Sequence, residues 1–510
     1  MEYELRGLEP REYQKNIAET ASKSNTLVVL PTGMGKTLIA VLVVINRLNK
    51  YPDSKILILS PTRPLSAQHR KSLEQYTSID PEEIIILTGK IKPEDRVKLY
   101  ETAKVIIATP QTIENDLKNE RINLKNFSFV VFDEAHRAVK EYSYPYVAKR
   151  YLLQAANPLI LGLTASPGGT REKINDICNN LFIKSVEIRS EVDEDVEEYV
   201  QPVEREFVYV DFPEEFKKIK TLLEEVLKDD LYWLKDHKYL PSYRPPRKLL
   251  LDLQRRILGK YSGSRNFSLF WVMVRTVSAV KIEHALELIE TQGVEFLYDY
   301  LKKLVVSKKK TDERIMKDDR MKEVLKRSEE LHSKKFDHPK LKKLIEIVKD
   351  LIKENKKLKI IVFANYRSTV DRICETLKNE NIKTEILIGQ TMKEGKGLTQ
   401  EQQIDILKRF SSGMFNVLVT SSIGEEGLDI AETNYAIFYE PVASEIRTIQ
   451  RRGRVGRQTM GKVIFLITKG TRDEAYYFSA FNKEKKMKKI LYKLKENGID
   501  RKENLLDWTS

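Results

Sequence analysis

The chain of 510 residues is 41% hydrophobic, which excludes a disordered protein and predicts more than one folded core. Lys and Arg outnumber Asp and Glu by 89 to 75, and the net charge of +14 fits a polyanionic partner such as nucleic acid, although an ordinary solvated surface also fits it. The two cysteines, Cys178 and Cys374, lie far apart in the sequence, so neither a zinc site nor a disulfide framework is expected.

Residues 1–202 are expected to form a first α/β lobe. The first residues do not form a signal peptide, and the apolar run at residues 38–45 is too short to span a bilayer, so we expect a cytoplasmic, intracellular protein without a membrane partner. Short apolar runs alternate with helical patterns, which is typical of a parallel sheet covered on both faces. Five runs predict its strands, at residues 26–30, 56–59, 105–108, 129–132 and 159–163.

A phosphate-binding loop is predicted where the first of these strands ends. Glycines in this loop would let backbone N–H groups approach phosphates at the start of a helix. Lys36 would reach the β- and γ-phosphates, and the hydroxyl of Thr37 would bind Mg²⁺. The strict pattern begins with glycine, whereas this sequence has Leu30 at that position. The residues expected to bind ATP here are Thr32, Gly33, Met34, Gly35, Lys36 and Thr37.

A tetrapeptide of Asp133, Glu134, Ala135 and His136 follows the strand at residues 129–132. Asp133 can hold Mg²⁺ opposite Thr37, and Glu134 can orient and deprotonate the attacking water. In isolation the tetrapeptide would fit a solvated turn. Its position after an apolar strand and downstream of a phosphate loop favours a catalytic role.

Residues 203–335 have a different pattern, which is helical and rich in charge. Helical stripes appear from residue 216 to 226 and from residue 271 to 289, and lysines cluster at residues 302–303 and 308–310. A structureless loop of this length would be improbable in a compact protein. We therefore expect an all-helical inserted domain that binds nucleic acid, with a domain that only stiffens the hinge as the alternative.

Residues 336–485 are expected to form a second α/β lobe, followed by a helical tail at residues 486–510. Its strands are predicted at residues 360–363, 384–388, 417–420, 435–438 and 461–466. The segment from Gln450 to Arg457 carries several arginines, whose planar guanidinium groups suit bidentate contacts with phosphate. We expect arginines of this segment to reach the γ-phosphate from this lobe, with Gln450 in the same catalytic group, although a basic surface helix is the alternative.

Together these segments resemble, in motif order, a superfamily 2 helicase with two RecA-like lobes. The resemblance implies that Arg11 and Gln14 read adenine, that Gly427 and Asp429 contact ATP, and that Arg454 and Arg457 are finger arginines. It further implies that His136, Thr164 and Ser166 couple hydrolysis to movement. The residues that it places on nucleic acid are Thr62, Arg63, Thr109, Gln111, Asn365, Arg367, Thr420 and Ser421.

The helical insertion and the arginine-rich segment look most like the Hef family of archaeal fork-DNA helicase–nucleases. That family is related to the Fanconi anaemia group M helicases and, more distantly, to Dicer-like and RIG-I-like helicases. The resemblance implies a DEAH-box DNA helicase or translocase that uses ATP and Mg²⁺, moves 3′ to 5′ and acts on forked or branched DNA in replication-fork repair. A double-stranded RNA-dependent ATPase and a nucleic-acid-binding scaffold with an inactive ATPase are the alternatives.

The resemblance also implies protein partners. These are a nuclease domain outside this chain, and a sliding clamp or other replication and repair proteins. The family's nuclease motif is Glu-Arg-Lys-x-x-x-Asp, whereas residues 500–507 begin with Asp and have the wrong spacing, so no cleavage activity is assigned.

Overall fold

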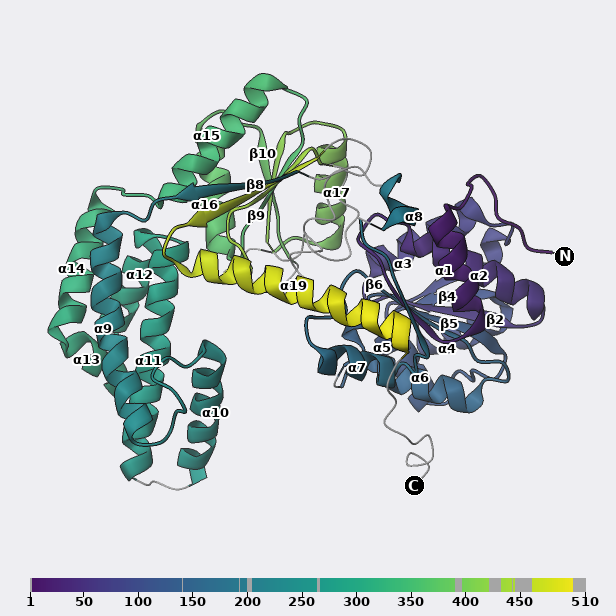
Figure 1. The fold of residues 1–510 in the computed structure, drawn as a ribbon, viewed down its shortest axis with the longest axis horizontal. Coiled ribbons are helices and arrows are strands. Elements are labelled where there is room, and N and C mark those ends of the chain that lie inside the picture. Colours follow the sequence, from purple (N-terminus) through teal and green to yellow (C-terminus); the bar gives the residue numbers. More distant parts are fainter. Residues whose placement is uncertain are drawn as a thin grey trace.

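The computed structural model describes residues 2–139, 141–191, 193–199, 204–263, 267–389, 397–421, 433–442, 444 and 461–498. Two parallel sheets form separate lobes, and a helical bundle lies on the side of the second lobe that is remote from the first (Figure 1). The predicted fold class, two α/β lobes with an all-helical insertion, is confirmed.

Lobe 1 is a seven-stranded sheet in the order β3-β4-β2-β5-β6-β1-β7, and its strand pairs are parallel. Strands β1, β4, β5 and β6 are buried along their whole length, because helices cover both faces. The strands are β1 (Thr26–Val29), β2 (Lys55–Leu59), β3 (Ile84–Leu87), β4 (Val105–Ala108), β5 (Phe127–Phe132), β6 (Ile160–Thr164) and β7 (Ser185–Ile188).

Apolar side chains on the two faces of this sheet form two separate cores, one around Phe132 and Tyr144 and the other around Val28 and Phe129. The covering elements are α1 (Glu12–Lys23), α2 (Lys36–Lys50), α3 (Arg63–Tyr76), η1 (Pro81–Glu83), α4 (Pro93–Thr102), α5 (Pro110–Lys118), η2 (Ala135–Arg137), α6 (Ser143–Gln154), α7 (Arg171–Asn180) and α8 (Glu194–Glu197).

The helical insertion has a hydrophobic core of its own, in which Phe216, Leu286 and Leu297 are buried. Helix α11 packs against α9, α10 and α12, so it forms the centre of the bundle. The helices are α9 (Glu214–Asp236), α10 (Arg247–Gly263), α11 (Phe267–Thr291), α12 (Val294–Val305), α13 (Lys310–Lys317) and α14 (Asp319–Ser333).

Lobe 2 is a six-stranded sheet in the order β10-β11-β9-β12-β13-β8, again with parallel pairs. Its described elements are β8 (Glu204–Val210), α15 (Pro339–Glu354), β9 (Ile360–Phe363), α16 (Arg367–Asn379), β10 (Thr384–Leu387), α17 (Gln400–Ser411), β11 (Val417–Thr420), β12 (Tyr435–Phe438) and β13 (Lys462–Thr468).

Helix α19 (Arg472–Asn497) leaves lobe 2 directly after β13 and runs to lobe 1 (Figure 1). Thr471 caps its first turn, because the threonine hydroxyl accepts a hydrogen bond from the backbone N–H of Asp473. Near its other end, Met487, Leu491 and Leu494 are buried in a core of lobe 1. One continuous helix therefore contacts both lobes.

The structure differs from the expected segment boundaries in two places. The range 203–335, expected to be all helical, begins with β8, which pairs with β13 along seven residues and belongs to the sheet of lobe 2. The expected boundary at residue 485 falls inside α19. In addition, β3 and β7 of lobe 1 were not predicted.

Within the ranges that the structure describes, no helix combines the length and the apolar character needed to cross a bilayer. Cys178 and Cys374 are both buried thiols that form no disulfide.

Candidate active site

The carboxyl-terminal edge of lobe 1 gathers most of the predicted site residues of that lobe. Because the strands are parallel, the loops that follow them all open at one edge of the sheet. The sheet order places the loops after β4 and β2 side by side, and next to them the loops after β5, β6 and β1. Residues predicted to hold nucleic acid therefore lie at one end of the edge, and residues predicted to hold ATP lie at the other.

The phosphate loop joins β1 to α2 through two glycines with positive φ, Gly33 at 91° and Gly35 at 75°. A Cβ atom on Gly35 would lie 2.2 Å from Gln14 Nε2, so no other residue fits without a shift. Lys36 Nζ donates to the carbonyls of Leu30 at 2.9 Å and Pro31 at 3.3 Å, which turns the ammonium group back into the loop. Thr32 and Thr37 are partly buried, and Thr37 lies in the first turn of α2.

Two residues of α1 fasten the phosphate loop through the carbonyl of Met34. Gln14 Nε2 donates to that carbonyl at 3.3 Å, and the buried hydroxyl of Tyr13 donates to it at 2.8 Å. Gln14 Oε1 also accepts the backbone N–H of Arg11 at 3.0 Å, so the same side chain caps the start of α1. The guanidinium group of Arg11 lies 4.9 Å from the ring centroid of Tyr199.

Asp133 directly follows β5 in a buried position, where His69 Nε2 lies 2.9 Å from its Oδ2 atom. The backbone N–H of Glu134 donates to Oδ1 at 2.9 Å. Burial alone would raise the pKa of Asp133, but His69, Lys36 and the Glu134 N–H outweigh it and hold the pKa below its ordinary value. Asp133 is therefore a carboxylate at neutral pH, as a cation ligand must be.

Glu134 has a left-handed backbone conformation, with φ at 50° and ψ at 49°, which is uncommon for a residue with a Cβ atom. Its Oε2 atom is buried and lies 3.1 Å from His136 Nδ1, but accepts no hydrogen bond within the described ranges. His136 Nδ1 lies 3.3 Å from the hydroxyl of Thr164, which connects this turn to the end of β6.

Thr164 and Ser166, predicted to couple hydrolysis to movement, are both buried after β6. The backbone N–H of Ser166 donates to the hydroxyl of Thr164 at 3.1 Å. The hydroxyl of Ser166 donates to the sulfur of Met487 on α19 at 3.1 Å. The segment after β6 thus contacts both the turn at Glu134 and the helix that comes from lobe 2.

The predicted nucleic-acid residues of lobe 1 begin two neighbouring helices. Thr62 caps α3, in which Arg63 is the first residue, and Thr109 precedes α5. The hydroxyl of Thr109 lies 2.8 Å from that of Thr112, and Gln111 is exposed. The starts of these helices lie at the carboxyl ends of the adjacent strands β2 and β4.

In lobe 2, the predicted nucleic-acid residues lie at the carboxyl end of β11 and just after β9 and β11. Arg367 Nη2 donates to the carbonyl of Gly389 at 3.2 Å, and Asn365 is partly buried. Thr420 is fully buried, and its hydroxyl donates to the carbonyl of Leu387 at 2.9 Å, so it faces the interior of the lobe. Ser421 is also buried, with 7% of its surface exposed. The side chains of Thr420 and Ser421 are therefore not exposed to solvent in this structure.

Five predicted residues lie outside the residues that the structure describes, and they are Gly427, Asp429, Gln450, Arg454 and Arg457. Three other residues of the site were not predicted from the sequence: Tyr13, His69 and Tyr144. Tyr144 donates through its hydroxyl to the carbonyl of Asp133 at 2.6 Å. Tyr13 adjoins the predicted Gln14, whereas His69 and Tyr144 carry no motif signal, because their contacts arise only when helices pack on the sheet.

The residues present fit a nucleotide with Mg²⁺. The glycines keep the loop backbone open to phosphates, and Lys36 supplies a cation beside it. Thr37 and Asp133 offer the oxygen ligands that Mg²⁺ prefers, and such sites usually share the ion with substrate phosphates. The buried Oε2 atom of Glu134 retains acceptor capacity for a water molecule.

Three family models match consecutive parts of the chain. The DEAD/DEAH box helicase family matches residues 11–174, and the helicase conserved C-terminal domain matches residues 339–459. Between them, residues 215–335 match the helical bundle of a putative ATP-dependent RNA helicase family.

Individual proteins are similar over most of this chain. A putative ATP-dependent RNA helicase of Methanocaldococcus jannaschii is 44% identical over 95% of this chain, which covers 61% of that protein. A putative ATP-dependent DNA helicase of Schizosaccharomyces pombe, fml2, is 32% identical over 91% of this chain, which covers 62% of that protein. This chain thus spans about three fifths of the length of both relatives.

The crystal structure of the Pyrococcus furiosus Hef helicase domain is 45% identical, with a TM-score of 0.73. The match covers 92% of this chain and 98% of that one. A similarity of this extent and identity shows common family as well as common fold. The chain belongs to the superfamily 2 helicases of the Hef and FANCM type.

Proposed function

We propose that this chain is an ATP-driven motor that unwinds or translocates along forked or branched DNA, moving 3′ to 5′, in replication-fork repair. The observation that carries the proposal is the buried network of Asp133, Glu134, His136 and Thr164 beside a phosphate loop, in a chain whose relatives are helicases. Intact acidic and basic groups in this network favour a working ATPase over an inactive scaffold.

The roles of the side chains follow from their positions. Gln14 and Tyr13 hold the loop for the nucleotide, and Lys36 would contact the β- and γ-phosphates. Mg²⁺, held by Thr37 and Asp133, would neutralise charge that develops on the phosphates. Glu134 orients the attacking water and accepts its proton, with its carboxylate positioned by His136. Arginines 454 and 457 are expected to complete the site from lobe 2.

The helical insertion offers a surface for the DNA backbone. Lys248, Arg255 and Arg256 are exposed on α10, which lies on the side of the bundle that faces lobe 1 (Figure 1). Lysines 302, 303, 308, 309 and 310 are exposed near the junction of α12 and α13. Contacts between such side chains and phosphates carry no sequence information, so they can recognise the shape of a junction.

A comparison of nucleic acids tests the proposal. The rate of ATP hydrolysis is measured without nucleic acid and with single-stranded DNA, linear duplex DNA, forked DNA and duplex RNA. We expect forked DNA to give the largest stimulation at equal phosphate concentration. A chain that hydrolyses ATP equally in all five conditions is not a nucleic-acid motor.

A double-stranded RNA-dependent ATPase is the second candidate. The M. jannaschii relative and the family that matches the helical bundle are both described as RNA helicases, which favours this alternative. The motor residues would be the same for both polymers, so they do not discriminate. Largest stimulation by duplex RNA would select this function. A nuclease domain, a sliding clamp and other repair proteins stay predictions about partners.

A further inference from the structure

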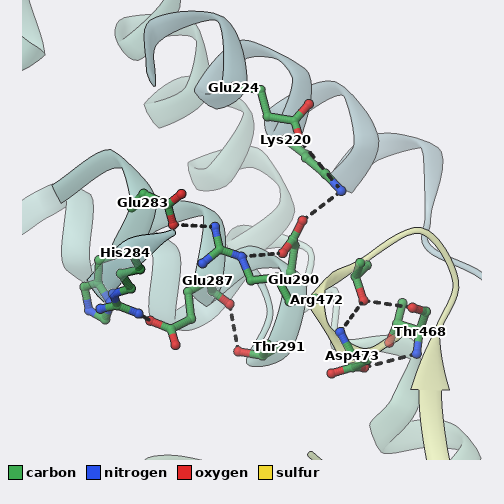
Figure 2. Close-up of polar contacts among 12 residues, drawn as sticks. Lys220, Glu224, Glu283, His284, Glu287, Glu290, Thr291, Thr468, Arg472 and Asp473 are labelled. Atoms are coloured by element: carbon green, nitrogen blue, oxygen red, sulfur yellow. Dashed lines mark hydrogen bonds and ion pairs between the residues drawn. The ribbon is translucent and has the colours of Figure 1, made fainter. Parts of the chain in front are cut away.

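The first turn of α19 is held by the helical insertion on one side and by lobe 2 on the other. Arg472 pairs with Glu283 and with Glu290, both at 2.8 Å, and both carboxylates project from α11 (Figure 2). The next residue, Asp473, accepts a hydrogen bond from the backbone N–H of Thr468 at 3.1 Å (Figure 2). It also accepts one from Lys340 Nζ at 2.8 Å. Because Lys340 and Asp473 are both buried, this pair fixes the base of α19 to lobe 2.

Glu287 connects the same face of α11 to lobe 2 at a second point. It lies one helical turn from Glu283 and from Glu290, so the three carboxylates form a row. The hydroxyl of Tyr366, which lies between the predicted nucleic-acid residues Asn365 and Arg367, donates to Glu287 at 2.6 Å. Burial alone would raise the pKa of Glu287, but His284, Tyr366 and Arg247 outweigh it and lower the pKa to about 2. The three carboxylates of this row, through Arg472 and Tyr366, therefore hold the insertion against lobe 2.

The far end of α19 is built into lobe 1. Met487, Leu491 and Leu494 are at most 5% exposed, and they pack among the core residues of that lobe. The hydroxyl of Tyr492 donates to Asp193 at 2.6 Å, and Lys495 pairs with Glu187 at 3.3 Å. Met487 lies fifteen residues beyond Arg472, or about 22 Å along a helix with a rise of 1.5 Å per residue.

A continuous series of contacts leads from this end to the turn that holds Glu134. Met487 accepts from the hydroxyl of Ser166, and the backbone N–H of Ser166 donates to the hydroxyl of Thr164. That hydroxyl lies 3.3 Å from His136 Nδ1, which lies 3.1 Å from Glu134. A displacement of α19 along its axis would therefore act on the position of His136.

We propose that α19 is a lever that links the helical insertion to the segment after β6, and that Arg472 and Met487 are positioning residues at its two ends. This inference rests on the proposed function, because nucleic acid bound to the insertion is the signal that the lever transmits. Binding of nucleic acid shifts the insertion and lobe 2 together, and α19 moves with them. Met487 then changes the positions of Ser166 and Thr164 beside His136. The lever is an element whose position both sites bias, which is the physical requirement for coupling.

The first test uses Arg472→Gln in the full chain. ATP turnover is measured with and without forked DNA, together with the affinity for forked DNA and the thermal midpoint. We expect the ratio of stimulated to basal turnover to fall by about tenfold, a usual size for coupling between two sites. Basal turnover and fork affinity should not change, because Arg472 lies in neither the ATP site nor the exposed basic surface. Arg472→Lys, which keeps the charge, should restore part of the stimulation.

The second test acts at the other end. Met487→Leu keeps the buried volume but removes the sulfur that accepts from Ser166, so packing should survive while stimulation falls. Arg409→Gln is the matched control, since Arg409 on α17 pairs with Glu385 on β10 at 3.2 Å, and neither residue belongs to α19. This control should keep full stimulation.

The double variant decides whether the two ends belong to one lever. Arg472→Gln combined with Met487→Leu should reduce stimulation no further than the stronger single change, whereas multiplied effects would overturn the proposal. Full stimulation in a folded Arg472→Gln variant would also overturn it. Glu283→Gln replaces Arg472→Gln if that variant does not fold, with the same expected fall in stimulation. If no nucleic acid stimulates the unaltered chain, the proposed function fails and the lever fails with it.

Discussion

Asp133 and Glu134 are neighbours in the sequence, but the fold gives them different surroundings. Asp133 is buried beside His69 and Lys36, which hold its pKa below the ordinary value and keep it charged. Glu134 is turned by its left-handed backbone toward His136, and one of its oxygens accepts no hydrogen bond in the described ranges. These different surroundings suit Asp133 to hold a cation and Glu134 to orient and deprotonate a water molecule.

At the residue scale, Lys36→Ala should abolish ATP hydrolysis and leave DNA binding without nucleotide intact. Lys36 contacts the phosphate loop, whereas we expect DNA affinity to come from exposed basic residues on other elements. Turnover and fork binding are measured on the same preparation. Lys50→Ala, at the opposite end of the same helix, is the control and should keep both activities. DNA-stimulated hydrolysis above a trace in the Lys36 variant would contradict the assignment of the loop.

Glu440 predicts a pH dependence of stability. It is fully buried after β12, where burial outweighs Lys340 and the Asn365 N–H and raises its pKa from the ordinary 4.5 to about 7. A carboxyl whose pKa is raised by folding stabilises the protein below pH 4.5 relative to higher pH, and this contribution is lost as pH rises to about 7. At about 1.4 kcal/mol per unit, the change is on the order of 3 kcal/mol.

Glu440→Gln should remove this pH dependence, because the amide stays neutral and can still accept from Asn365. The free energy of unfolding of the variant, minus that of the unaltered chain, should therefore increase from about pH 5 to about pH 8. Urea unfolding at the two pH values measures the difference. Glu385→Gln, at a partly exposed position on β10, is the control and should show little change. An equal effect of Glu440→Gln at both pH values would show that this carboxyl does not titrate between them.

At the scale of elements, the sequence predicts the interior strands better than the edges. The central strands are apolar throughout, since helices cover both faces, and this pattern is easily read. The three strands that were not predicted, β3, β7 and β8, all lie at a sheet edge and are only partly buried. β8 alternates between exposed and partly buried residues, and only its pairing with β13 identifies its lobe.

The site was predictable wherever a motif residue follows a strand, as Lys36 and Asp133 do. His69 was not, because its contact with Asp133 spans 64 residues and depends on how α3 packs against the sheet. The start of α19 was also missed. Its first half packs on lobe 2 and the insertion and its second half on lobe 1, so no single apolar stripe runs along it.

The basic face of α10 should contribute to fork recognition. Replacing Lys248, Arg255 and Arg256 by Gln should lower the preference for forked over linear duplex DNA and leave basal hydrolysis unchanged. The salt dependence of fork binding should become shallower by about one unit of slope for each phosphate that these side chains neutralise. Lys322→Gln with Lys326→Gln on α14 is the control, since that helix lies on the opposite side of the bundle (Figure 1). Full fork preference after the α10 changes would move branch recognition to the lobes.

At the scale of the molecule, the chain consists of lobe 1 and a larger body in which lobe 2 carries the insertion. The ion pairs of Arg472 and the hydrogen bond of Tyr366 hold that larger body together, and α19 joins it to lobe 1. Closing the lobes on ATP would therefore carry the insertion, and any DNA on it, relative to lobe 1. We therefore expect ATP hydrolysis and movement of DNA to accompany the same rigid-body motion of the two parts.

Closure should depend on the arginines of residues 450–457, which lie outside the described residues. Arg454→Ala or Arg457→Ala should leave ATP binding intact and lower turnover by about 10³-fold, because an arginine from the opposite lobe stabilises charge that develops on the γ-phosphate. ATP affinity and turnover are measured separately, with a distance probe between the lobes to follow closure by an ATP analogue. Arg451→Ala, in the same segment, is the control. Unchanged turnover with weaker DNA binding would instead make this segment a basic surface helix, and the trigger for closure would then have to lie elsewhere in lobe 2.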